Sequence, residues 1–135
     1  MTKKILLATL GGAVVLFLLG GLIYGLLLAD MLAGMMEAGK ACMNDPISMP
    51  WIIVANIVQA LLLAMVLDKF GISTVQSGAI AAAWITLLIG VMFDSWMFAQ
   101  FNFMTTNMMV IDVIANTLMG ALAGAVIGWI LGKVK

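Results

Sequence analysis

Hydrophobic residues run through this chain in long stretches that few charges interrupt. Residues 5–29 and 50–67 carry no charge, and between residues 70 and 132 the only charged residues are Asp94 and Asp112. A helix rises about 1.5 Å per residue, so about 20 apolar residues cross a hydrocarbon core of about 30 Å. The pattern therefore predicts helices that cross a membrane.

The long stretch after residue 70 must contain a turn, because it exceeds one crossing. Gln100, Asn102 and the polar run 105–107 divide it into two apolar halves. In lipid the backbone must satisfy its own hydrogen bonds, which helices do within one segment. We therefore predict an all-α fold, an integral membrane bundle of four antiparallel transmembrane helices forming a single domain. The expected spans are residues 5–29, 50–67, 73–99 and 107–132.

The lysines predict how this bundle is oriented. Five of the six lie at the end of the bundle that holds the termini, and only Lys40 lies at the other end. By the positive-inside rule we expect both termini to be cytoplasmic, in a multi-pass protein of the bacterial inner membrane. Residues 30–49 would then form an outer loop, whose apolar stripe would lie flat in the headgroup layer.

The start of the chain also has the order of charges seen in a secretory signal peptide. Lys3 and Lys4 precede an apolar run, but a signal peptide has an apolar region of only about 7–15 residues. The run here continues to residue 29, and no A-x-A-like cleavage site follows it. We therefore expect a retained membrane helix.

Composition narrows the chemistry available. The chain is 65% hydrophobic and 9% charged, against roughly 25% charged residues in a soluble domain. The formal net charge is zero, which gives no basis for binding nucleic acid. His and Arg are both absent, and the single Cys42 has neither a disulfide partner nor zinc-site spacing. We predict no catalytic constellation, no metal site and no cofactor, and expect a non-enzymatic protein.

Thirteen methionines are many for a chain of this length. Thioethers are soft ligands that suit Cu(I), so an outward-facing copper site is one interpretation. Flexible apolar packing is the commoner use of methionine, and no repeated spacing singles out a ligand set. We therefore interpret them as packing residues.

Glycines in the first and last spans predict close helix packing. Lipid provides no hydrophobic drive between helices, so small residues that let backbones approach define the contacts. Gly21 and Gly25 form one such pair, and Gly120, Gly124 and Gly128 form a glycine zipper in the last span. The last span would either self-associate or pack against the first span within one bundle, and we favour the second interpretation.

Polar side chains gather at one depth in the outer half of the predicted bundle. Asn56 with Gln59, and Asp112 with Asn116, each share a helix face. Polar groups within a bilayer are costly and are functional candidates, although interhelical hydrogen bonds worth roughly 0.6 kcal/mol each would also explain them. Since the Asp112–Asn116 row continues into the glycine row, we expect a polar pocket. Its predicted members are Tyr24, Asn56, Gln59, Asp94, Asp112 and Asn116.

Three parts of the chain carry a family resemblance: residues 20–24, the hairpin 79–103, and residues 111–112 with 118–121. In these parts the chain resembles small bacterial four-helix membrane proteins that form a domain family of unknown function. The resemblance implies the four-helix membrane fold. It implies no reaction and no catalytic residue.

The function expected from these features is binding. The protein would be an accessory, partner-binding or homo-oligomeric subunit that contacts membrane lipid and holds a lipid-like ligand in the polar pocket. Its partner would be a second copy or a larger membrane complex. The alternative is a transporter or channel for a small solute or ion that uses Asp112, Asn116, Asn56 and Gln59.

Overall fold

The structure is a computed structural model that describes residues 2–44 and 46–134, and all of its regular elements are helices. Four of them are long and apolar enough to cross a membrane, and η1 extends the first of these spans to residue 27. The predicted all-α bundle is confirmed, and these helices fit a multi-pass membrane protein. The elements are α1 (Lys3–Leu22), η1 (Ile23–Leu27), α2 (Ala29–Ala38), α3 (Met49–Lys69), α4 (Val75–Gln100) and α5 (Thr106–Lys133).

Local sequence explains where the long helices begin. Thr2, Thr74 and Thr105 cap α1, α4 and α5, and each hydroxyl accepts a hydrogen bond from a backbone N–H three residues on. Pro50 lies in the first turn of α3, where its missing N–H costs nothing. Between α3 and α4 the chain reverses at Gly71, whose φ of 68° favours glycine.

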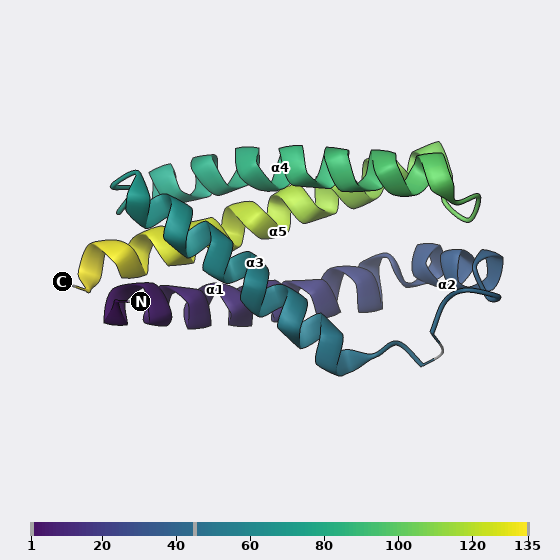
Figure 1. Ribbon diagram of the computed structural model, residues 1–135, viewed down its shortest axis with the longest axis horizontal. Coiled ribbons are helices and arrows are strands. Elements are labelled where there is room, and N and C mark those ends of the chain that lie inside the picture. The colour runs from purple at the N-terminus through teal and green to yellow at the C-terminus, as the bar shows by residue number, and fades with distance from the viewer. Residues whose placement is uncertain (1, 45, 135) are drawn as a thin grey trace.

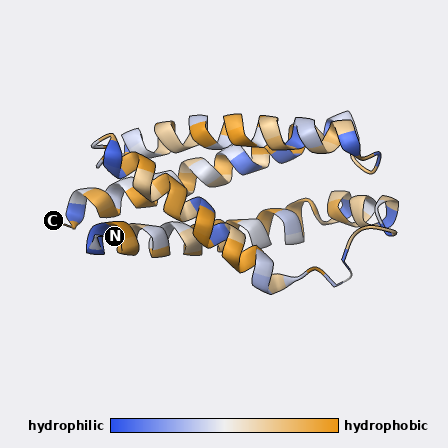
Figure 2. Cartoon of the chain, viewed as in Figure 1, coloured by the Kyte–Doolittle hydropathy of each residue, from blue (hydrophilic) through white to orange (hydrophobic). Residues whose placement is uncertain are grey.

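α1, α4 and α5 run along the long axis of the molecule and α3 crosses α1 obliquely, with both termini at the same end (Figure 1). We call this the terminal end, and the opposite end, which carries α2 and the α4–α5 turn, the loop end. α4 and α5 make the most extensive helix contact, while α1 packs against α3 and α5. Hydrophobic colours dominate all four helices, and hydrophilic ones interrupt α5 in its half toward the loop end (Figure 2). Lys135, which the topology prediction includes, lies outside the described residues.

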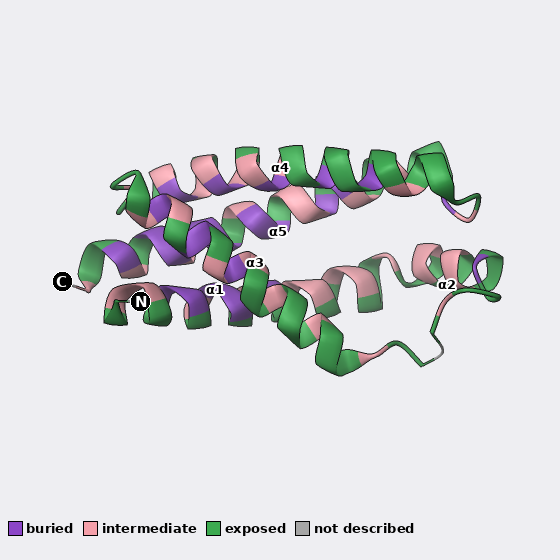
Figure 3. Cartoon of the chain, in the orientation of Figure 1, coloured by how far each residue is buried: buried purple, intermediate pink, exposed green. Residues whose placement is uncertain are grey.

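The core lies toward the terminal end (Figure 3). The buried residues of α1 all fall between residues 8 and 16, and those of α3 between 60 and 67. Leu63, Leu67 and Ile127 are fully buried there, and an ion pair between Lys4 and Asp68 joins α1 to α3. The bundle is therefore closely packed at its terminal end and more open at its loop end.

Two rows of small residues form the seam between α4 and α5. The buried residues of α4 recur at every fourth position; they are Gly78, Ala82, Thr86, Gly90 and Asp94. The first three face glycines of α5, and Gly90 lies next to Val113. A Cβ added at Gly124 would meet the Ala82 methyl and lie 2.5 Å from the Gly78 carbonyl oxygen. A Cβ added at Gly120 would overlap the Thr86 side chain. The two backbones are thus in direct contact.

The glycine pairing differs from the sequence prediction. The α5 glycines pack against α4, while α1 meets α5 through Gly11 and Gly12, next to Ile130 and Ile127. A Cβ added at residue 21 or 25 would meet no heavy atom of the described chain within 4 Å, so Gly21 and Gly25 pack no helix here. The reason is complementarity: α4 offers a continuous small-residue row, whereas α1 places Leu16 and Leu19 between its glycines.

Gly124→Ala should lower the stability of the bundle. The added methyl has no space in the seam, and overpacking of this kind costs about 1–3 kcal/mol. Gly34→Ala is the matched control, because Gly34 is exposed and the added methyl would make only an ordinary contact with the Met108 side chain. Thermal unfolding in mild detergent should show a lower midpoint for Gly124→Ala alone. Equal midpoints for the two variants would contradict the seam.

Candidate functional site

Both small-residue rows end in an aspartate near the loop end. Asp94 is the last buried residue of the α4 row, and Asp112 begins the α5 row that continues through Asn116 to Gly120. The two carboxyl groups are neighbours close enough to interact directly. Two negative charges repel strongly in such a weakly polar setting, so this arrangement favours a proton or a cation between them.

Asp94 is the more enclosed member of the pair. Its residue is 3% exposed, and its Oδ2 atom has no hydrogen-bond partner among the described residues. A buried polar atom usually has a partner, and leaving one without costs about 1–3 kcal/mol. No N–H or O–H group of the described residues donates to this oxygen, so it can accept only from a bound group or from a proton shared with Asp112.

Tyr24 forms a hydrogen bond with the other aspartate, Asp112. Its hydroxyl donates a 2.6 Å hydrogen bond to Oδ1 of Asp112, which joins residues 88 positions apart. Tyr24 lies in η1, the π-helical turn in which Leu28 N–H donates to the Ile23 carbonyl at 2.7 Å. Such turns are rare and often occur at functional sites.

A cavity of about 390 Å³ lies at the carboxyl pair. Its volume is in the range of sites for small organic molecules, about 300–1,000 Å³. Phe101 and Phe103 form part of the wall, with ring centroids 5.3 Å apart. α2, the loop after it, α4, the α4–α5 turn and α5 all contribute. The lining residues are Met35, Cys42, Met43, Phe93, Asp94, Met97, Phe101, Phe103, Met104 and Asp112.

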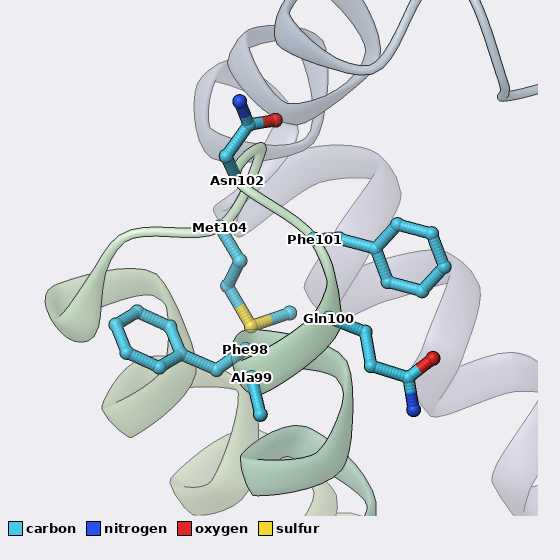
Figure 4. A pocket seen from close by; sticks show the side chains of 6 residues that line it. All are labelled: Phe98, Ala99, Gln100, Phe101, Asn102 and Met104. Atoms are coloured by element: carbon cyan, nitrogen blue, oxygen red, sulfur yellow. The ribbon is translucent and has the colours of Figure 1, made fainter.

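A second depression, of about 660 Å³, lies at the α4–α5 turn and shares Phe101 and Met104 with the cavity. In Figure 4 the Met104 side chain points toward Phe98, whereas the amides of Gln100 and Asn102 point away from one another. None of the described residues that line it is charged. Its polar groups do not converge, so we assign it no ligand.

The structure assembles only part of the predicted polar pocket. Tyr24, Asp94 and Asp112 come together, and Asn116 lies one turn along α5, half-buried. Asn56 and Gln59 do not line this cavity.

The packing of α3 keeps Asn56 and Gln59 out of the predicted pocket. The Asn56 amide donates a 2.8 Å hydrogen bond to the Ile52 carbonyl of its own helix. Asn56 also lines a separate apolar groove of about 320 Å³ between α1 and α3. Gln59 is half-buried, and no hydrogen bond of its side chain is found among the described residues. At its loop end α3 has no buried residue, so its polar side chains do not reach the carboxyl pair.

The sequence analysis missed the sulfur-rich and aromatic wall of this cavity. Four methionines, Cys42 and three phenylalanines meet there from segments far apart in the sequence. The Cys42 thiol donates to the Gly39 carbonyl at 3.3 Å, and the Met43 side chain packs over the same glycine. The four-residue spacing of the α4 row is the signal that could have marked Asp94 as facing inward.

Within the described residues, no three His, Cys, Asp or Glu side chains group as metal ligands.

Comparison with protein-family models, with curated proteins and with solved structures gave no match. The resemblance to small four-helix bacterial membrane proteins therefore stays a prediction. The features of the molecule that bear on function are the cavity, the carboxyl pair and Tyr24.

Tyr24→Phe should lower stability by about 0.6 kcal/mol and by no more than about 1.7 kcal/mol, the range measured for hydrogen bonds between membrane helices. Because the bond joins Tyr24 to Asp112, the effect should disappear in an Asp112→Ala background, which lacks the acceptor oxygen. The wild-type protein, the two single variants and the double variant are unfolded by titration with a denaturing detergent. Their free energies of unfolding give the coupling energy between the two residues.

Thr117→Val is the control for this cycle. Its hydroxyl donates to the Val113 carbonyl of its own helix, so its effect should add to that of Tyr24→Phe. Additive effects of Tyr24→Phe and Asp112→Ala would contradict the contact between them.

Proposed function

We propose that this protein is a non-enzymatic integral membrane protein that binds a small, lipid-like ligand in the loop-end cavity. The observation that carries the proposal is the buried, unpartnered oxygen of Asp94 in a cavity with apolar walls. Pockets for small molecules combine such walls with a few polar groups that fix orientation. The phenylalanines and methionines would hold the apolar part of the ligand, and the carboxyl pair its polar part.

The proposed location is a bacterial inner membrane, with both termini in the cytoplasm. Lysine placement supports this orientation through the positive-inside rule. The cavity would then lie in the outer half of the bilayer, open to ligands from the outer leaflet or from outside the cell.

Cys42 provides a direct test of this orientation. It is exposed, is the single cysteine of the chain, and lies at the loop end. A membrane-impermeant maleimide should label it in intact bacterial cells. The control combines Cys42→Ser with Ser73→Cys, which moves the thiol to an exposed position at the terminal end. That variant should be labelled only after the cells are permeabilised, and the reverse result would invert the topology.

Native mass spectrometry in mild detergent tests ligand binding. The wild-type protein should retain a bound small molecule, and Met97→Trp should lose it because the larger ring fills the cavity. Met92→Trp is the matched control, since Met92 lies on the same helix and is 66% exposed. Equal retention by all three proteins, or an empty wild-type protein, would contradict the proposal.

Transport is a second candidate, favoured by the carboxyl pair within the membrane-spanning segments. A cation entering the cavity could replace a proton shared by Asp94 and Asp112, which would couple the two movements. Asn56 lies outside this cavity and supports no such path. Flux of a bound ligand into proteoliposomes would distinguish transport from binding.

Association with a partner helix is also part of the proposal. Gly21 and Gly25 leave open space on the face of α1 and η1, which would allow another helix to approach closely. The partner would be a second copy of the chain or a subunit of a larger membrane complex. The α5 glycines are already occupied by α4 and offer no such surface.

A further inference from the structure

We infer that the ligand of the loop-end cavity is an organic cation, a protonated amine with an aromatic or branched apolar body. This inference rests on the proposed binding function and specifies its ligand. Three features carry it: the charge of the cavity, its unused hydrogen-bond acceptor and the chemistry of its walls.

The carboxyl pair lacks a positive partner from the described chain. Among the described residues, Asp94 and Asp112 are the only charged ones that line the cavity. At the loop end the one lysine is Lys40, which is exposed and lies 3.8 Å from Glu37. A buried carboxylate is stable when an opposite charge is paired with it, so a cationic ligand would supply what the protein does not.

The acceptor geometry favours a ligand that donates hydrogen bonds. Tyr24 already donates to Oδ1 of Asp112, while Oδ2 of Asp94 is buried and unpartnered. An ammonium group can donate up to three hydrogen bonds, and bonds between charged groups are the stronger ones. One ammonium group at the two aspartates would donate to their carboxyl groups and offset the carboxylate charge.

The walls favour an organic cation over a bare metal ion. Phenylalanine rings attract cations through their faces, and methionine thioethers adapt to apolar shapes. Hard metal ions take six or more oxygen ligands, and this lining provides two carboxyl groups. A soft ion would need the sulfurs, but the Cys42 thiol donates to Gly39 and Met43 packs over that residue.

Phenylpropylamine and phenylpropanol form a suitable pair of probes. They match in size and both donate hydrogen bonds, but only the amine is charged near neutral pH. Binding is measured by calorimetry on the full chain in lipid nanodiscs, with Met97→Trp as the blank for partition into lipid. We expect the wild-type protein to bind the amine at least about tenfold more tightly than the alcohol.

Asp94→Asn should weaken amine binding by about tenfold or more and leave alcohol binding unchanged. Asp30→Asn is the charge control, because it removes an exposed carboxylate of α2 at the same end and should change neither affinity. If Asp94→Asn does not fold, Asp112→Asn takes its place. The charge preference of the wild-type protein decides the question without either variant.

The possible failures can be told apart. Equal or tighter binding of the alcohol, or binding of Ag(I) with no binding of the amine, would overturn the cation assignment. The proposed function would survive if native mass spectrometry still found a molecule that Met97→Trp expels. Binding of neither probe together with an empty wild-type protein would overturn both.

Discussion

Direct backbone contact between α4 and α5 is the constraint on which the rest of this structure depends. Between helices in lipid the hydrophobic effect contributes little, so close approach must supply the attraction through dispersion. Glycine, alanine and threonine at every fourth position of α4 meet the glycines of α5 and allow that approach. The resulting hairpin is the surface against which α1 packs at the terminal end, and α3 packs on α1 and joins the same buried cluster.

The same seam explains why two aspartates are neighbours inside a membrane protein. Asp94 continues the small-residue row of α4, and Asp112 continues the row of α5. The glycines of these rows lie at the interface between the two helices. Their side chains are therefore directed toward the interface and away from lipid. Tyr24 reaches this point from the π-helical turn of the first span, so the carboxyl pair is held by three separate segments.

Loose packing at the loop end is what leaves room for a cavity there. The buried residues of α1 and α3 end well before that end of the bundle, and α2 with the following loop covers the opening. Methionine suits such a place because its side chain fills irregular space without a fixed shape. An apolar chamber with two carboxyl groups results, and this combination supports the proposed binding of a small organic molecule.

The sequence by itself determined the four spans, their antiparallel order and the position of the turns, because length, hydropathy and capping residues are local properties. It also marked Tyr24, Asp94 and Asp112 as costly within a membrane. Only the tertiary structure decided which polar residues meet, since helix faces that read alike in sequence can turn toward different neighbours. Asn56 and Gln59 thus lie apart from the carboxyl pair, and Gly21 and Gly25 face open space. The π-helical turn and the sulfur-rich wall also arise from contacts between distant segments, which residue spacing within one helix does not reveal.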